Sequence, residues 1–292
     1  MKGLLLILAG GVLVVGLLGS AALAGNGMGR DGDPNVTRAD LRGVNFVESC
    51  GFSHAGSDDP IVFPGRAGAS HRHSFVGNRS TDASSTHGSL RAAPTSCERP
   101  ADTAAYWAPT LYLGTTAVEP EGATIYYRRD TLAEVRPFPD NFRMIAGDAK
   151  ATTPQGRQVT FWNCGLLAGV PPSSTVPACP SGKRSFLRLH IRFPSCWNGR
   201  SLDSADHRSH LAYAMRGACP STHPVAVPAI TLIYRYRDLS VHPGSEASLA
   251  LASGGQLSAH GDFFNAWKPK VLERLVDRCL NALVHCGRAA AR

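Results

Sequence analysis

Residues 185–193 read SFLRLHIRF, and this stretch decides the fold class of the chain. Two sets of side chains alternate along it, an apolar set of Leu187, Leu189, Ile191 and Phe193 and a basic set of Arg188, His190 and Arg192. Successive side chains of a β-strand point to opposite faces of the sheet, so this strand has one apolar and one basic face. The stretch therefore predicts a half-buried β-strand.

Short runs of β-forming residues recur along the chain between prolines and glycines, at residues 44–50, 110–113, 123–129, 142–146, 158–163 and 230–236. Many short strands with long irregular connections are typical of a β-sandwich or a jelly-roll-like domain. One helix is expected, roughly over residues 269–285, where apolar residues recur at helical spacing after a proline that suits the first turn. The sequence thus predicts a mainly β fold with one C-terminal helix.

The N-terminal segment is typical of a secretory signal peptide. A positive start at Lys2 precedes an almost continuously apolar run over residues 4–18, and an A-x-A pattern at residues 22–24 directly precedes Gly25. An uncleaved membrane anchor is the alternative, because residues 3–24 are just long enough to span a bilayer. We expect a signal peptide at residues 1–24, a flexible tether at 25–40 and a single secreted domain at 41–292.

The eight cysteines agree with an extracellular protein. An even number of cysteines behind a signal peptide predicts a disulfide framework, and no C-x-x-C motif indicates a thiolate zinc site. Sequence neighbours are the expected partners, because three of the resulting pairs bracket short segments. The expected disulfides are Cys50–Cys97, Cys164–Cys179, Cys196–Cys219 and Cys279–Cys286.

The chain is basic, with a formal net charge of +8 at pH 7. Its basic residues are scattered along the sequence, without a dense run or a nucleic-acid-binding motif. We expect a solvated basic surface and no nucleic-acid partner, while a weak attraction to acidic glycans stays open.

Three short segments concentrate histidine and aspartate, at residues 70–78, 203–210 and 260–267. In a strand His71 and His73 would share one face, and His207 and His210 would converge within one helical turn. The third segment has His260 and Asp262 two residues apart. We expect these segments to meet in one pocket, since grouped polar side chains can satisfy one another. A purely structural hydrogen-bond network is the alternative.

Several longer motifs, in this order, make the chain recognisable: FVESC (46–50), DDPIVFPG (58–65), SHRHSFVGN (70–78), YWAPTLY (106–112), FPSCWNG (193–199), DSADHRSH (203–210), CPSTHP (219–224) and HGDFFNAW (260–267). With them the chain resembles a domain-of-unknown-function family of secreted actinobacterial and fungal proteins, whose fungal members sometimes carry WSC cell-wall modules. The resemblance implies a secreted, cysteine-containing domain and brings no catalytic residue with it.

Three hypotheses of function follow from the segments. The first is an enzyme that acts on an extracellular or cell-wall polysaccharide by acid/base catalysis. Its catalytic set is His71, His73, Asp206, His207 and Asp262. The second is an extracellular protein that binds zinc or copper. Its ligand set is His71, His73, His207, His210 and His260. The third is a non-catalytic wall-binding module in which the histidines are structural and Trp107 or Trp267 stacks on sugar rings.

The export prediction has a direct test. We expect the mature protein to begin at Gly25 and to carry all eight cysteines in disulfides. The measurement is the intact mass of exported protein, with and without reduction before alkylation. An unprocessed N-terminus would contradict the signal peptide, and alkylation without reduction would contradict the complete pairing.

Overall fold

The strand predicted at residues 185–193 forms as β9 (Leu187–Arg192) in the computed structural model, which describes residues 35–180, 185–237, 239 and 241–288. Leu187, Leu189 and Ile191 are fully buried. Arg188 and Arg192 are half-exposed on the opposite face. The alternation in the sequence therefore predicts the buried face of this strand correctly.

The largest sheet follows the order β7-β15-β3-β2-β1-β6-β13-β9-β8, and β16 pairs with β1 outside this path. Its strands are β1 (Asn45–Gly56), β2 (His73–Gly77), β3 (Ala105–Pro109), β6 (Gly122–Arg128), β7 (Arg143–Gly147), β8 (Thr160–Asn163), β13 (Ala229–Tyr236), β15 (His260–Phe264) and β16 (His285–Gly287), besides β9. All pairs along the path are antiparallel, whereas β16 runs parallel to β1.

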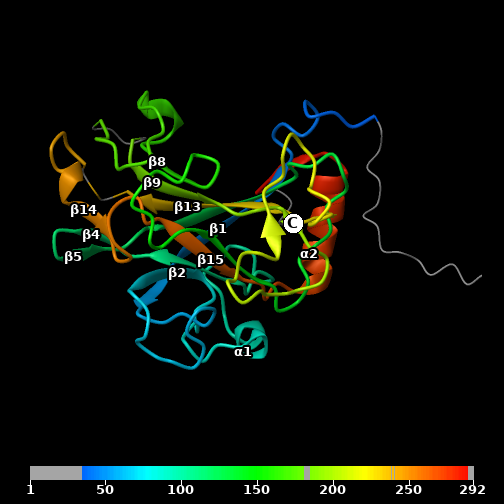
Figure 1. Cartoon of the computed structure of the whole chain (residues 1–292), viewed down its shortest axis with the longest axis horizontal. Coiled ribbons are helices and arrows are strands. Elements are labelled where there is room, and N and C mark those ends of the chain that lie inside the picture. Colours follow the sequence, from blue (N-terminus) through cyan, green and yellow to red (C-terminus); the bar gives the residue numbers. More distant parts are fainter. Residues whose placement is uncertain (1–34, 181–184, 238, 240, 289–292) are drawn as a thin grey trace, which may run out of the picture.

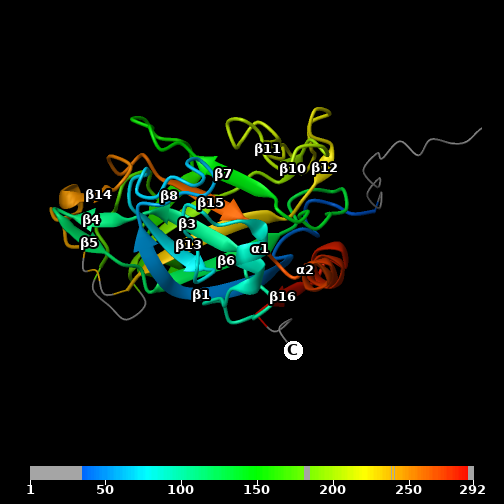
Figure 2. The ribbon, with the colours of Figure 1, turned by 90° about the horizontal axis from the view of Figure 1, so that it is seen from below.

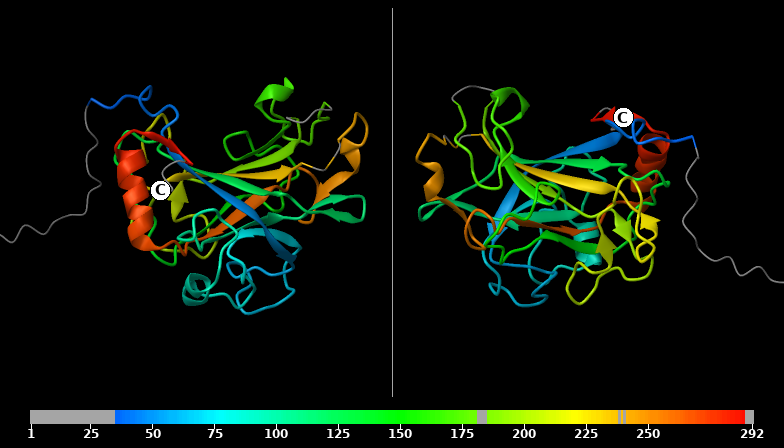
Figure 3. Two further views of the ribbon diagram at one scale, coloured as in Figure 1. Left: turned by 180° about the vertical axis from the view of Figure 1, so that it is seen from behind. Right: turned by 45° about the horizontal axis from the view of Figure 1, so that its top comes forward.

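Strand β1 belongs to both halves of this sheet. Residues 45–51 pair with β6, and the register with β2 then shifts between Phe52 and His54. The sheet bends across β1, so its two halves face each other around one large apolar core (Figure 3). Opposite ends of the path approach closely, because a Cβ atom on Gly261 of β15 would lie 3.0 Å from Ile191 of β9. The nearly closed, mainly β fold confirms the predicted class.

Smaller elements surround the large sheet. One three-stranded sheet, β10 (Cys196–Trp197), β11 (Leu211–Ala212) and β12 (Val225–Ala226), lies on the side of β7 (Figure 2). The other, β4 (Leu111–Leu113), β5 (Thr116–Val118) and β14 (Leu249–Leu251), lies at the far end from helix α2 (Figure 1). Two short 3-10 helices are η1 (Leu166–Ala168) and η2 (Glu246–Ser248).

The loops after β1 and β2 cover the outer face of the β2 half of the sheet (Figure 1, cyan). They include helix α1 (His87–Ala92), which begins at a capping box between Thr86 and Ser89. Ile61 and Leu90 from these loops pack on a second, smaller apolar cluster with Phe75, Trp107 and Phe264 of the sheet. This face is therefore buried although it lies outside the main core.

The predicted C-terminal helix exists but is shorter than expected. Helix α2 spans Pro269–Leu275, with its proline in the first turn, and continues as the π-helical turn η3 (Val276–Asn281). Leu283 then adopts a φ of 57°, and the chain turns back to form β16 beside β1. The expected extent to residue 285 is wrong because pairing with β1 outcompetes another helical turn.

All four predicted disulfide pairs are present, and the described residues contain no free cysteine. Four disulfides indicate that the protein belongs in an oxidising environment. The predicted signal peptide, residues 25–34 of the tether and the last four residues lie outside the described residues. Within the described ranges, no helix combines the length and apolarity that crossing a membrane requires.

His190 of β9 gives the fold a testable pH dependence. Burial, with help from the charge of Arg192, lowers the pKa of His190 from 6.5 to about 3. The unfolded chain therefore binds a proton that the folded protein does not bind between these values, so stability falls as the pH falls from about 6.5 to about 3.

We expect His190→Phe to remove this dependence while keeping a ring stacked on Phe161. Relative to the wild type, the variant's free energy of unfolding should rise by about 3 kcal/mol between about pH 7 and about pH 4. Urea unfolding across this range measures the change. Parallel stability curves for the two proteins would contradict the assignment.

Candidate metal centre

The candidate site lies on the covered outer face of the β2 half of the sheet. His73 begins β2 and His260 begins β15, and β3 separates the two strands. Trp107 of β3 pairs with Phe75 of β2 on one side and with Asp262 of β15 on the other. Because side chains two residues apart share a face, His73, His260 and Asp262 all project toward the covering loops.

Three imidazoles meet there. The Nε2 atoms of His71 and His260 are 3.2 Å apart, and the ring centroids of His71 and His73 are 4.3 Å apart. One ring nitrogen of each histidine lies within 4.8 Å of a ring nitrogen of each of the others. His73 and His260 are almost fully buried, whereas His71 is half-buried and precedes β2 instead of forming part of it.

Two backbone carbonyls orient the buried rings. The Nδ1 of His73 lies 3.1 Å from the Asp58 carbonyl oxygen, and the Nδ1 of His260 lies 3.0 Å from the Ser258 carbonyl oxygen. A carbonyl oxygen only accepts, so both Nδ1 atoms carry the proton and both Nε2 atoms of the neutral rings present a lone pair. The Nε2 of His73 is buried and has no hydrogen-bond partner among the described residues.

The environment keeps these rings neutral. Burial lowers the pKa of His71, and it lowers the pKa of His260 to about 4. The pKa of His73 falls well below its ordinary value, first through burial and then through the neighbouring His71 and His260. All three imidazoles are therefore in the protonation state that metal binding requires at neutral pH.

Two buried aspartates, Asp59 and Asp262, lie near each other on the same covered face. Asp262 is fully buried, and neither of its carboxylate oxygens has a hydrogen-bond partner among the described residues. Burial and the nearby Asp59 raise its pKa well above the ordinary value, while Arg208 opposes them. Asp59 itself accepts hydrogen bonds from the backbone N–H groups of Ile61 and Val62.

From the sequence, Asp59 is expected to lie in a turn, and it could add an acceptor to the histidine cluster that follows it. The D-D-P sequence at residues 58–60 indicates a turn, and the hydrogen bonds of Asp59 show that it holds one. Its position near Asp262 follows from where the covering loop lies on the sheet. No local pattern predicts this proximity, because Asp262 is about two hundred positions away in the sequence.

The segment at residues 203–210 approaches this face but forms turns instead of the helical turn that was expected. His207 has a φ of 58°, and its carbonyl accepts a hydrogen bond from the Ile145 N–H of β7. The His207 Nδ1 lies 2.8 Å from an Asp203 carboxylate oxygen. Burial raises the pKa of Asp59, while its backbone hydrogen bonds and the nearby His207 oppose this shift. His207 therefore lies near the carboxylates without joining the three imidazoles.

His210 and Asp206 hold the conformation of this segment. Both ring nitrogens of His210 are engaged, Nδ1 with the Ser204 hydroxyl and Nε2 with the Arg143 carbonyl oxygen. Asp206 is exposed, and one of its oxygens accepts hydrogen bonds from Ser204 Oγ, from both the N–H and the Oγ of Ser209, and from the Arg208 N–H. These hydrogen bonds lower the pKa of Asp206 far below its ordinary value.

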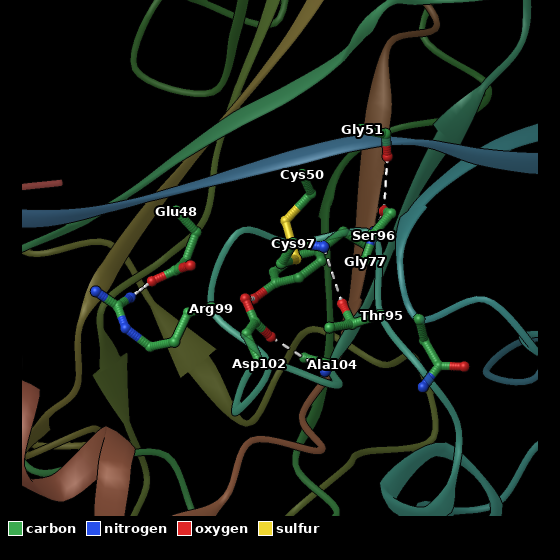
Figure 4. Close-up of a disulfide and its surroundings, with 12 residues drawn as sticks. Glu48, Cys50, Gly51, Gly77, Thr95, Ser96, Cys97, Arg99, Asp102 and Ala104 are labelled. Carbon is green, nitrogen blue, oxygen red and sulfur yellow. Dashed lines mark hydrogen bonds and ion pairs between the residues drawn. A yellow bond between two sulfur atoms is a disulfide. The ribbon is translucent and has the colours of Figure 1, made fainter. Parts of the chain in front are cut away.

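A second group of potential ligand atoms lies in the main core. Cys50, Cys97 and Asp102 lie close enough together for a metal site. The two sulfurs form a disulfide, so they offer no thiolate, and Asp102 is hydrogen-bonded to Ala104 and Tyr106 (Figure 4). The group is a structural element of the core.

The tryptophans proposed for sugar stacking are inside the protein. Trp107 and Trp267 are both fully buried, and the Trp267 Nε1–H donates to the Tyr127 hydroxyl. Neither ring presents a face to a polysaccharide.

The chain matches, over residues 59–267, a protein family described as a domain of unknown function, DUF1996. The chain belongs to this family. No curated protein and no solved structure matches the chain. The DUF1996 region contains the three imidazoles and Asp59 and Asp262, whereas β1 and α2 lie outside it.

The contacts of Asp206 predict a structural effect of its removal. We expect Asp206→Ala to lower the free energy of unfolding by about 1–2 kcal/mol, because several donors in the turn lose their shared acceptor. Asp206→Asn should restore part of this stability, since an amide oxygen still accepts. Chemical denaturation of the three proteins measures the effect, and a stability unchanged in Asp206→Ala would contradict it.

Proposed function

We propose that this domain binds one transition-metal ion outside the cell, with His71, His73 and His260 as its ligands and zinc or copper as the metal. The observation that carries the proposal is the convergence of three neutral imidazoles, one of which has a buried Nε2 without a partner. A hydrogen bond from the His71 Nε2–H to the Nε2 of His260 could satisfy one pair of rings. It would leave His73 unsatisfied, whereas a cation would engage all three lone pairs.

One pair of the nitrogens already has the spacing that a small cation requires. Imidazole nitrogens bind zinc at about 2.0–2.1 Å, so two of them at a tetrahedral angle lie about 3.3 Å apart. The Nε2 atoms of His71 and His260 are already 3.2 Å apart. The carbonyl contacts of the two Nδ1 atoms are the outer-shell interactions that usually fix a ligating histidine.

The imidazole ligands favour a metal of intermediate softness. Imidazoles suit zinc and copper, whereas calcium and magnesium prefer oxygen ligands. Three imidazoles are also the ligand number of a catalytic zinc site, in which the metal acts as a Lewis acid on a fourth ligand. The half-exposed position of His71 supports access from solvent on its side of the group.

The carboxylates support the same proposal. Burying an ionised carboxylate without a partner is unfavourable, so a buried carboxyl group either keeps a proton or faces a positive charge. Asp262 shares a strand face with His260, two residues away, and its oxygens have no hydrogen-bond partner among the described residues. A bound cation on this face would supply the compensating charge.

The glycan-active enzyme and the wall-binding module stay predictions with less support. Of the proposed acid/base carboxylates, Asp206 accepts hydrogen bonds from its own turn, and Asp262 is buried away from solvent. The candidate stacking rings Trp107 and Trp267 are buried. A metal site at the three imidazoles requires none of these groups to be exposed.

The test is metal stoichiometry. We expect the wild-type protein, stripped with a chelator and then dialysed against zinc or copper, to retain about one equivalent. His71→Ala, His73→Ala and His260→Ala should each reduce retention to near zero, because a three-ligand site tolerates no loss. Bound metal is measured by elemental analysis, and the folded state of each apo variant is checked by thermal unfolding.

Two further variants sharpen the result. His207→Ala should retain the metal, and its failure to do so would overturn the assigned ligand set. His242→Ala, at an exposed position, controls for binding to surface histidines. Because His73 and His260 are buried, the half-buried His71 is the decisive position. Normal retention by a folded His71→Ala protein would refute the proposal.

A further inference from the structure

The outer face of the other half of the sheet has a very different character. Strands β6, β13 and β9 are neighbours, and each alternates an inward apolar set with outward residues. Four arginines lie on the outward side, and together we call them the arginine face: Arg128, Arg188, Arg192 and Arg235. Scattered in the sequence, these residues share a surface through strand pairing alone.

The pairing brings like charges together. Arg188 of β9 is directly opposite Arg235 of β13. Burial lowers the pKa of Arg192, and the charge of the nearby Arg128 lowers it further. Like charges in opposite positions of neighbouring strands destabilise a sheet. This repulsion between the arginines opposes folding, and an anionic partner would relieve it.

Aromatic rings hold the guanidinium groups in place. Arg128 lies over Tyr126 at 4.7 Å, Arg192 over Phe161 at 5.1 Å and Arg188 over Phe186 at 4.3 Å, each measured to the ring centroid. A guanidinium stacked on a ring keeps N–H groups at its edge for oxyanions. Because stacking limits the motion of these side chains, less conformational entropy is lost when they bind an anion.

The described residues supply few counter-charges. Glu121 forms ion pairs with Arg235 and with the adjacent, exposed Arg237. Among the residues that the structure describes, no carboxylate lies within ion-pair distance of Arg128, Arg188 or Arg192. These three arginines therefore remain available to a ligand.

We propose that the arginine face binds an acidic polysaccharide that carries a carboxylate on its sugar units. Arg188 and Arg192 are four residues apart on one strand, which corresponds to about 13 Å, and β6 and β9 are separated by about 10 Å across β13. A single small anion cannot reach charges spread this widely. A polymer with repeated carboxylates can engage several of them, each through a bidentate pair.

Other polyanions fit this face less well. Proteins bind single-stranded nucleic acid with aromatic faces on which bases stack, but guanidinium groups already cover Tyr126 and Phe161. A membrane surface calls for exposed apolar side chains beside the basic ones. The exposed Leu166 and Leu167 belong to η1, outside the three strands of the arginine face.

The experiment measures binding of the full disulfide-bonded protein to polygalacturonate at low salt, with neutral dextran as the reference polymer. We expect binding to polygalacturonate alone, weakening as salt is added. The double variant Arg188→Gln/Arg192→Gln should bind about tenfold more weakly or worse. The matched control is Arg66→Gln/Arg79→Gln, which removes the same charge from exposed positions elsewhere and should stay within about twofold of the wild type.

Two further arms keep the test decisive. Arg188→Lys/Arg192→Lys keeps the charge but loses the planar guanidinium, so an intermediate loss of binding supports bidentate recognition. The same variant provides a second test in case the Gln variant does not fold. A chelator should leave binding unchanged, since this face is independent of the metal site. The proposal fails if the wild type does not bind polygalacturonate or if it binds phosphatidylglycerol vesicles instead. It also fails if the Gln variant binds polygalacturonate as tightly as the control variant does.

Discussion

Strand β1 joins the two halves of the large sheet, because it pairs with both β6 and β2. Its first seven residues are hydrogen-bonded to β6, and the residues beyond them pair with β2 across a shift in register. Two buried interactions hold this strand against the loop that follows α1, the Cys50–Cys97 disulfide and the ion pair between Glu48 and Arg99 (Figure 4). Because the sheet bends at β1, its two halves enclose one core and turn their outer faces in different directions.

The two outer faces then acquire opposite physical environments. Loops cover the face of the β2 half, so its imidazoles are desolvated and neutral, the state in which they can bind a metal. Among the described residues, the face of the β6, β13 and β9 strands has no comparable apolar cluster, and its arginines stay partly solvated and charged. A metal site needs the first environment and recognition of a polymer needs the second, so one bent sheet can provide both.

Unsatisfied polar groups occur on the covered face, as they do at several other buried positions of the described residues. The His73 Nε2 and both oxygens of Asp262 lack partners among the described residues, although buried polar groups are normally hydrogen-bonded. By contrast, Asp102 in the main core is as deeply buried, yet both its oxygens accept hydrogen bonds. The protein is thus able to satisfy a buried carboxylate where the role is structural, which makes the exceptions beside the imidazoles informative.

Local pattern determined the alternating strands, three of the four disulfides and the closeness of His71 to His73, because all of these involve residues near one another in the chain. Only the tertiary structure brought His260 to them across 189 positions, engaged both ring nitrogens of His210 and ended the C-terminal helix early. It also gathered dispersed arginines on one surface. The physical reason is that strand order and register are set by contacts between distant segments. A pattern with a period of two residues states which side of a strand is polar, but it does not state which strands lie beside it.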